Sequence, residues 1–273
     1  MKSNSQLIKL FLVVAFSCTS LLVSLIPVLA KPTLGSLLSD GLRLRSNHKT
    51  TLAQATFNQP SLPPGPPPGG RVRGGAKRGP GCELTKLDLT ALVPFTQEAN
   101  SVINVWGETT QERPSWFFYV PYTKDLPYAV QFVLQDQDSN EIYQKAIALP
   151  DKPGVIRVSL PSTAPALVVD KQYHWFLKIN CDKEENSPPT FVDGVIQRVE
   201  VNPATAKELQ TTEPLKRYAI YAQKGIWYEA LTILAQLRQK NPEDAALQTE
   251  WRNLLSSIHL DDIAAEPILS DKP

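Results

Sequence analysis

From Cys82 onward, short apolar runs alternate with turn residues, a pattern that predicts an all-β domain. The clearest run is "KQYHWFLKIN". In an extended strand it places Tyr173, Trp175 and Leu177 on one face and the intervening residues on the other, so we expect Trp175 in the core. The other runs expected to form strands are "LTKLDLTALVP", "SWFFYVPY", "YAVQFVLQD", "NEIYQKAIAL", "GVIRVSLP" and "FVDGVIQRVEV". Roughly seven strands without crossover helices predict a β-sandwich.

The region before the "KQYHWFLKIN" strand suggests a type of sandwich. The spacing of Leu167 and Tyr173 resembles the corner before the sixth strand of fibronectin type III and immunoglobulin-like domains. In that corner the tyrosine hydroxyl bonds to upstream backbone. The resemblance implies an Ig/fibronectin III-like β-sandwich and no particular function. The segment from Thr96 to Arg113 fits no strand of that architecture.

The C-terminal part of the chain has helical periodicity. The segment "YAQKGIWYEALTILAQLRQKNP" predicts the end of one helix, a glycine turn and a second helix, and residues 243–258 predict a third. Four positions have the spacing of the late half of a tetratricopeptide repeat: Gly225, Trp227, Ala230 and Pro242. On this spacing Trp227 packs between the two helices. Only one unit fits, so the chain is expected to end in a small helical module and not in a solenoid.

Helix pairs of this kind commonly bind proteins. Because adjacent helical residues point about 100 degrees apart, Trp227 and Tyr228 cannot both face the same neighbour. We expect Tyr228, with Leu231 and Ala235 on successive turns, to contact a partner. The alternative is that this stripe docks on the β domain and binds nothing external.

The N-terminal residues 1–30 have the pattern of a signal peptide. Lys2 and Lys9 precede an apolar stretch, and small residues up to Ala30 form a cleavage site. The mature protein is therefore expected to be exported, to the periplasm or the extracellular space. The apolar stretch is also long enough to remain as an uncleaved membrane anchor.

Two cysteines remain after such cleavage, Cys82 and Cys181. In an oxidising compartment an even pair is expected to form a disulfide, and the alternative is two buried free thiols. Neither cysteine has a second ligand at zinc-site spacing, so we expect no metal site.

The charge is distributed unevenly along the chain. Residues 31–81 carry eight basic side chains and one acidic side chain, whereas residues 82–273 have an acidic excess. Residues 31–81, which include a Pro/Gly-rich run, are predicted to form a basic disordered linker. Four of its cations are candidates for binding an anionic polymer or lipid surface: Arg71, Arg73, Lys77 and Arg78. The alternative is a solubilising tail, and no aromatic residues are interleaved with these charges as in nucleic-acid binders.

The sequence offers no convincing catalytic constellation or cofactor site. The three histidines are dispersed, and no nucleophile motif or phosphate-binding glycine loop accompanies them. Aromatic residues such as Trp106, Trp116 and Trp227 are candidates for a sugar platform in a polysaccharide-binding protein or hydrolase, although core packing also explains them. We therefore expect no catalytic residue and no cofactor.

The order of several segments resembles the domain of unknown function family 928. The segments are "GGAKRGPGC", "LTALVP", "ERPSWFFYVPY", "VQFVLQDQDSNEIYQ", "YHWFLKINC" and "GIWYEALTILAQLR". The resemblance covers residues 70–268. It implies a secreted protein of the kind found in cyanobacteria, with no activity, cofactor or catalytic residue attached.

Together these patterns predict a mainly β protein with a smaller α part. The expected order is a signal peptide (1–30), a linker (31–81), a β-sandwich (82–203), a helical hairpin module (204–260) and a flexible tail (261–273). The expected function is that of an exported non-catalytic interaction or scaffold protein of the cell envelope. Its partner would be an envelope protein or an anionic polymer, and not nucleic acid. Proximity to the membrane surface is part of the same expectation.

Overall fold

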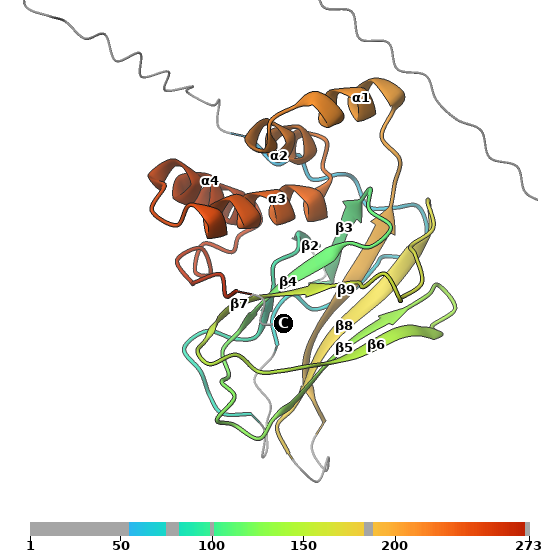
Figure 1. Cartoon of the computed structure of the whole chain (residues 1–273). Coiled ribbons are helices and arrows are strands. Elements are labelled where there is room, and N and C mark those ends of the chain that lie inside the picture. The colour runs from blue at the N-terminus through green and yellow to red at the C-terminus, as the bar shows by residue number, and fades with distance from the viewer. Residues whose placement is uncertain (1–54, 75–81, 99–100, 183–187, 271–273) are drawn as a thin grey trace, which may run out of the picture. The chain divides into compact units, whose positions relative to one another are not determined.

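The computed structural model describes residues 55–74, 82–98, 101–182 and 188–270, which form two β-sheets and a group of helices (Figure 1). The strands in these residues are β1 (Thr90–Ala91), β2 (Phe95–Gln97), β3 (Ile103–Thr109), β4 (Ser115–Val120), β5 (Ala129–Gln135), β6 (Glu141–Ile147), β7 (Gly154–Ser159), β8 (Gln172–Asn180) and β9 (Thr190–Arg198). The helices are α1 (Pro203–Thr211), α2 (Pro214–Gln223), α3 (Trp227–Lys240) and α4 (Ala245–Ser256). The prediction of a mainly β chain with C-terminal helices is confirmed.

The two sheets pack through aromatic side chains. One sheet has the strand order β1-β4-β7 and the other β2-β3-β9-β8-β5-β6. The Trp116 ring of β4 lies 4.9 Å from the Phe132 ring of β5, and the Phe118 ring lies 5.7 Å from the Trp175 ring of β8. These contacts join the three-stranded sheet to the six-stranded sheet. All of β4 except Ser115 is buried, and its sequence is accordingly a continuous apolar run.

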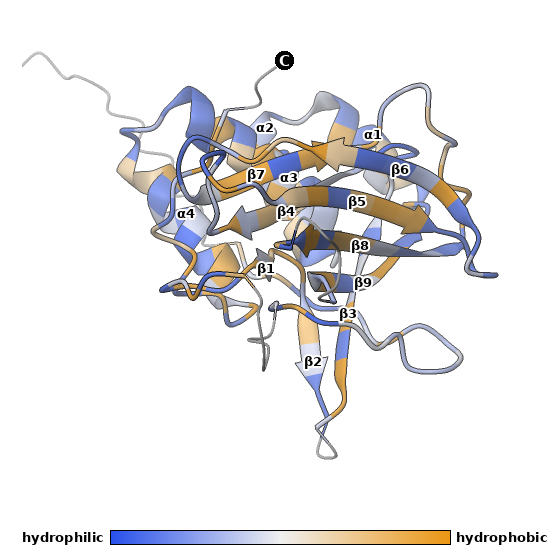
Figure 2. Cartoon of the chain, turned by 90° about the horizontal axis from the view of Figure 1, so that it is seen from below, coloured by the Kyte–Doolittle hydropathy of each residue, from blue (hydrophilic) through white to orange (hydrophobic). Residues whose placement is uncertain are grey.

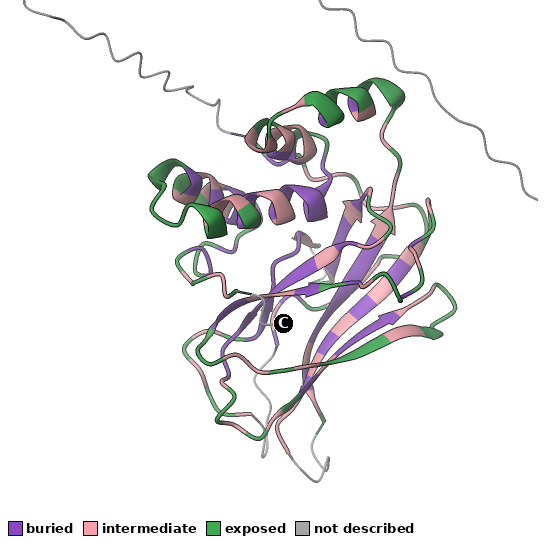
Figure 3. Cartoon of the chain, viewed as in Figure 1, coloured by how far each residue is buried: buried purple, intermediate pink, exposed green. Residues whose placement is uncertain are grey.

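Strand β8 follows the predicted alternation along its whole length. Buried and half-buried residues take turns (Figure 3), and Trp175 is fully buried, as expected. The Tyr173 hydroxyl accepts a hydrogen bond of 3.0 Å from the backbone N–H of Val168, which is the kind of upstream bond that the corner spacing predicts.

Strand β3 was not predicted, because the interval that contains it was expected to hold no strand. It pairs in parallel with β9, with Trp106 opposite Val195. Gly107 interrupts its apolar pattern, and the packing explains why glycine is there. A Cβ atom at Gly107 would lie 3.2 Å from a Tyr228 ring carbon and 3.5 Å from the Trp227 Cβ, so glycine allows α3 to approach β3 closely.

Helices α2, α3 and α4 form where the periodicity predicts them, whereas α1 was not predicted as a separate helix; Figure 2 shows the helices with both hydrophobic and hydrophilic positions. Helices α2 and α3 make a hairpin. Gly225 connects them with a φ of +77°, which non-glycine residues seldom adopt. The third predicted helix, 243–258, is α4, and its N-cap Asp244 accepts hydrogen bonds from two backbone N–H groups.

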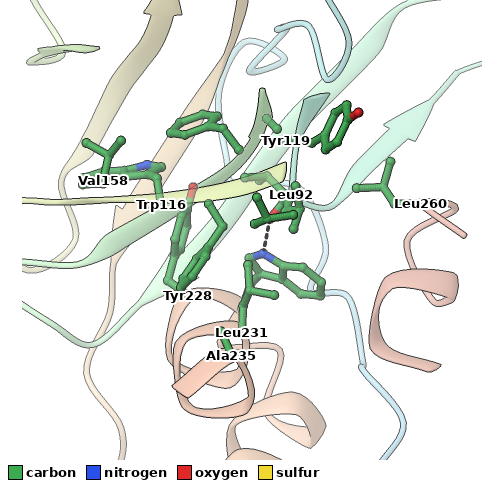
Figure 4. Packing of buried hydrophobic residues seen from close by; sticks show 14 of the residues in the cluster. Leu92, Trp116, Tyr119, Val158, Tyr228, Leu231, Ala235 and Leu260 are labelled. Carbon is green, nitrogen blue, oxygen red and sulfur yellow. Dashed lines mark hydrogen bonds between the residues drawn. The ribbon is translucent and has the colours of Figure 1, made fainter. Parts of the chain in front are cut away.

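Helix α3 packs on the β-sheets as well as on its neighbouring helices. The indole N–H of Trp227 donates a 2.8 Å hydrogen bond to the Leu92 carbonyl, and the Phe57 ring packs on Trp227 with centroids 4.8 Å apart. Figure 4 shows this bond, with Tyr228 reaching from α3 toward Trp116. The interpretation that Trp227 fills only the helix pair is therefore wrong, because its polar edge is held by the β domain.

Part of the predicted linker is packed against the folded body. In residues 55–74, Phe57 and Val72 are buried, and backbone hydrogen bonds join residues 69–74 to β1, β3 and β9. The disordered assignment of this stretch is wrong. Residue 57 supplies an aromatic anchor, and residues 69–74 complete hydrogen bonds that the strands leave open. The rest of the linker lies outside the described residues.

The predicted flexible tail also packs on the body through residue 270. Ile263 and Ala264 are buried, and Ile268 forms a parallel bridge with Val155 of β7. A Cβ atom at Gly154 would lie 2.8 Å from Leu269, so glycine makes room for this segment. The tail adds backbone pairing at the edge of the three-stranded sheet, and its assignment as flexible is wrong for residues 261–270.

Cys82 and Cys181 form the predicted disulfide, with their Cα atoms 5.0 Å apart. Disulfides persist in oxidising compartments, so this bond indicates an extracytoplasmic location. Among the described helices, none combines the length and apolarity needed to span a bilayer. The predicted signal peptide, residues 1–30, lies outside the described residues.

Candidate functional site

A polar pocket of about 300 Å³ lies between the β3–β4 connection and helices α2 and α3. It is at the lower end of the range of about 300–1,000 Å³ that is typical of small-molecule sites. The side chains that could contact a ligand's polar groups come from all of these elements: Thr109, Gln111, Arg113, Arg217, Tyr221, Glu229, Thr232 and Gln236. Its size suits a ligand about as large as one sugar ring.

Glu229 is a buried carboxylate in the first turn of α3, only 5% exposed. Its Oε1 accepts four hydrogen bonds, from the Thr109 hydroxyl (2.8 Å), the Thr110 N–H (2.7 Å), the Thr110 hydroxyl (2.9 Å) and the Gln111 N–H (2.9 Å). The side chain thus connects the start of α3 to the residues that follow β3. A carboxylate near a helix N-terminus is also stabilised by the helix dipole.

The other carboxylate oxygen, Glu229 Oε2, is buried without a hydrogen-bond partner. Buried polar atoms ordinarily have a partner, and one left without it is costly. Burial raises the pKa of Glu229, and the hydrogen bonds from Thr109 and Thr110 oppose that shift. Because the four donors all converge on Oε1, none of them is available to Oε2.

Two arginines line the same pocket with different surroundings. Arg113 is engaged, with a nitrogen 3.4 Å from a Glu112 oxygen and a second nitrogen donating to the Ala164 carbonyl at 3.3 Å. Arg217 of α2 forms no ion pair with any described residue. The Nε atom of each arginine is buried and unpartnered. The pocket therefore contains one guanidinium, that of Arg217, that forms no ion pair within the described part of the chain.

The two tyrosines of the pocket are held in their neutral form. Burial raises the pKa of Tyr221, and the Glu229 charge adds to that shift. Burial also raises the pKa of Tyr228, while the side chains of Trp175 and Trp116 oppose the shift. Both hydroxyls consequently keep their protons at neutral pH.

The described residues contain ten buried side-chain polar atoms without a partner, and four of them belong to residues that line this pocket. They are Arg113 Nε, Arg217 Nε, Tyr228 Oη and Glu229 Oε2. The Tyr228 hydroxyl faces the indoles of Trp116 and Trp175, which act on its pKa, so the other three atoms are the ones that a ligand could engage.

The predicted partner-binding stripe is internal. Tyr228, Leu231 and Ala235 are all at most 2% exposed, and the Tyr228 ring packs on Trp116 with centroids 5.9 Å apart. The prediction of an external contact surface is wrong for these residues, and the alternative of docking on the β domain describes them. Both Trp227 and Tyr228 are buried, because the first turn of α3 is enclosed by Phe57 on one side and Trp116 on another.

The predicted anion-binding cations are only partly described. Arg71 lies 4.5 Å from the centroid of the Phe191 ring, and Arg73 forms an ion pair of 2.8 Å with Asp262. These two side chains serve contacts within the fold, and that overturns their assignment to a free basic arm. Lys77 and Arg78 lie outside the described residues.

The residues that build the pocket were not predicted. Neither Glu229 of α3 nor Arg217 of α2 was singled out in the sequence. One signal was available in the sequence: Glu229 stands among Trp227, Tyr228, Ala230 and Leu231. An acidic residue in such an apolar stretch indicates a buried carboxylate, but its partners on β3 are about 120 positions away along the chain.

Glu229 predicts a specific pH dependence of stability. Its pKa is raised above the ordinary value of 4.5 in the folded protein, so the unfolded chain ionises first as the pH rises. The stability that the protonated group contributes is complete below pH 4.5 and is lost as the pH rises through the folded-state pKa. Tyr221 and Tyr228, whose pKa values burial raises, stay protonated at neutral pH.

We therefore expect the free energy of unfolding of Glu229→Gln to increase relative to wild type as the pH rises from about 4.5 through the folded-state pKa of Glu229. Urea unfolding at several pH values measures this difference. Glu243→Gln, at an exposed position before α4, is the matched control and should follow the wild-type profile. A Glu229→Gln profile parallel to wild type at every pH would contradict the assigned shift.

The fold and the pocket together define a class: a disulfide-linked two-sheet β domain with a helical cover and a polar pocket between the two. The chain belongs to the family described as Domain of Unknown Function (DUF928), whose model matches residues 73–268. The family resemblance expected from the sequence is confirmed.

Comparison with individual proteins adds little to the family assignment. No curated protein matches the chain. A solved structure that it resembles is a β-glucuronidase of Parabacteroides merdae with glycerol in its active site, at 12% sequence identity and a TM-score of 0.22. The alignment covers 64% of this chain and 32% of that one, so the chain spans about a third of the enzyme's length. A likeness this weak carries no argument about fold or activity.

Proposed function

We propose that this chain is an exported, non-catalytic recognition protein of the cell envelope, and that it binds a small polar ligand in the Glu229 pocket. The observation that carries the proposal is the group of unpartnered polar atoms around that pocket, above all Glu229 Oε2. An acceptor and two guanidinium donors without protein partners are the complement of a ligand that has both hydrogen-bond donors and acceptors.

Binding is better supported here than hydrolysis. Glycosidases that work by acid/base chemistry use two facing carboxyl groups, whereas Glu229 is the only carboxylate among the residues that line the pocket. Ser115, the only serine in the lining, exchanges a 2.7 Å hydrogen bond with Ser159 and not with a base. Trp106, Trp116 and Trp227, the candidates for a sugar platform, are buried, so the polar pocket is the better candidate site.

Export and the finer classification of the fold belong to the same proposal. The signal-peptide pattern of residues 1–30 and the disulfide support secretion. The Tyr173 hydroxyl bond to Val168 supports an Ig/fibronectin III-like origin for the sandwich, and the Gly225 turn supports a tetratricopeptide-like origin for the α2–α3 hairpin. We retain the envelope as the site of action, with Lys77 and Arg78 as the remaining candidates for contact with an anionic polymer.

The test is a thermal-shift screen of the mature chain with a library of sugars, sugar acids, amino acids and small anions. We expect at least one compound to raise the melting temperature of the wild type, because a ligand that binds only the native state stabilises it. Gln236→Trp places a bulky side chain in the pocket from an exposed position of α3, and should abolish the shift.

Gln210→Trp, the same substitution at an exposed position of α1 outside the pocket, is the matched control and should retain the shift. The proposal fails if no compound stabilises the wild type. It also fails if the shift persists in Gln236→Trp, because the ligand then binds elsewhere.

A further inference from the structure

We infer that the Glu229 pocket takes a singly charged hydroxycarboxylic acid about the size of one sugar ring, with its carboxylate on Arg217 and a hydroxyl on Glu229 Oε2. This is the chemistry of a sugar acid. The inference rests on the proposed function and specifies the ligand of the same pocket.

Arg217 is the residue that indicates an acidic ligand. It lines the pocket from α2, has no ion-pair partner among the described residues, and its Nε is buried without a hydrogen bond. A guanidinium presents its donors in a planar fork that matches a carboxylate. Arg113, in contrast, already contacts Glu112 and the Ala164 carbonyl, so Arg217 is the guanidinium with more free donors.

Glu229 indicates that the ligand carries a hydroxyl group. The four protein donors near this carboxylate all bond to Oε1, which leaves Oε2 as a buried acceptor without a partner among the described residues. A hydroxyl donates a hydrogen bond without bringing a charge into the pocket. An acid that lacks hydroxyl groups would leave Oε2 unsatisfied, which is costly for a buried oxygen.

The balance of charge favours a monoanion over a zwitterion. The charged residues that line the pocket are Arg113, Arg217 and Glu229, and Glu112 lies within 3.5 Å of both Arg113 and Arg198. Arg217 is the arginine of this group that forms no ion pair with a described residue, so its single positive charge is available to a ligand. A ligand with one negative charge neutralises it, whereas an amino acid would add an ammonium group beside two guanidinium groups.

The rest of the lining suits a hydroxylated molecule. Gln111, Thr232 and Gln236 offer neutral polar groups at the walls, and the half-buried ring of Tyr221 offers an apolar surface. A sugar-like ligand has hydroxyl groups that can hydrogen-bond to these polar side chains and C–H groups that can pack on the tyrosine ring. The volume of about 300 Å³ admits one ring and excludes most of a longer chain, so a polymer would be held by its terminal unit.

The experiment is isothermal titration calorimetry of the mature chain with D-galacturonate, neutral D-galactose and L-serine. We expect galacturonate to bind at least about 10-fold more tightly than galactose or serine, since one charge-assisted hydrogen bond is worth about a factor of ten or more. Arg217→Gln should weaken galacturonate binding by a similar factor, and Arg217→Lys should restore part of it.

Arg252→Gln, at an exposed position of α4 outside the pocket, is the matched control and should bind galacturonate as the wild type does. Thermal unfolding of each variant checks that folding is retained. Trigalacturonate separates two sources of the same chemistry: tighter binding than the monomer identifies the end of a polysaccharide, and equal or weaker binding identifies the free acid. Both results support the inference.

Equal binding of galactose, tighter binding of serine, or unchanged galacturonate affinity in Arg217→Gln would overturn the inference. So would a library compound that stabilises the protein through this pocket while galacturonate does not bind. Each of these results leaves the proposed function standing. Failure of every library compound to bind the pocket overturns the proposed function itself.

Discussion

Replacing Tyr228 with alanine is expected to lower the free energy of unfolding by about 3–5 kcal/mol, as for other large aromatic residues in a core. The side chain is 2% exposed and packs on Trp116, and a ring carbon lies against Gly107. Its removal leaves a cavity where α3 meets both β3 and β4. Urea unfolding measured by circular dichroism gives the difference.

Tyr228→Phe is the matched control for this prediction. It keeps the ring and removes only the hydroxyl, which makes no hydrogen bond within ordinary distance, although the indoles of Trp116 and Trp175 face it, so we expect a change of less than about 1 kcal/mol. If Tyr228→Ala is as stable as the wild type, the helix does not dock on the sheets through this residue. A loss of binding to a protein partner with unchanged stability would restore Tyr228 as a contact residue.

Removing the disulfide is the second large expected effect. The double variant Cys82→Ser, Cys181→Ser should lose about 2–5 kcal/mol of unfolding free energy, because the bond restricts the unfolded chain over a long loop. The two cysteines are 99 positions apart and connect the segment before β1 with the end of β8. Their partial burial adds packing contacts that serine keeps only in part.

Guanidinium unfolding of the wild type with and without a reducing agent gives an independent measurement of the same bond. Reduction should lower the midpoint of the wild type to that of the double variant, and should leave the variant unchanged. Equal midpoints for the oxidised and reduced wild type would mean that the disulfide does not stabilise the fold.

Elements with local periodicity could be predicted from the sequence. Strand β8 alternates without interruption, and α3 and α4 repeat their apolar residues at helical intervals. Strand β3 could not be found in this way. Gly107 breaks its pattern, and the reason for that glycine is the close approach of Tyr228, which follows it by more than a hundred positions.

Segments rich in proline and glycine misled the prediction for the same reason. Their composition argues for disorder, but the described residues 55–74 obtain their order from other parts of the chain. Phe57 packs on Trp227, and the backbone of Arg71 exchanges hydrogen bonds with that of Asp193. Neither partner is visible to a composition argument, which considers each segment by itself.

The pocket depended even more on tertiary contacts. Periodicity assigned the first turn of α3 to an interface, and the interface exists, but it lies inside the chain and includes a carboxylate. The hydrogen-bond donors to Glu229 come from residues 109–111, in the interval where no strand was expected. The site could not be predicted because strand β3 was not predicted. The end of β3 and the two residues after it position every donor to Glu229 Oε1.

A crystal structure of the mature chain soaked with D-galacturonate tests the central claim most directly. We expect electron density for the ligand in the pocket, with its carboxylate at Arg217 and a hydroxyl within hydrogen-bond distance of Glu229 Oε2. An empty pocket at ligand concentrations that saturate binding in solution, or density for the ligand at any other place on the molecule, would contradict it.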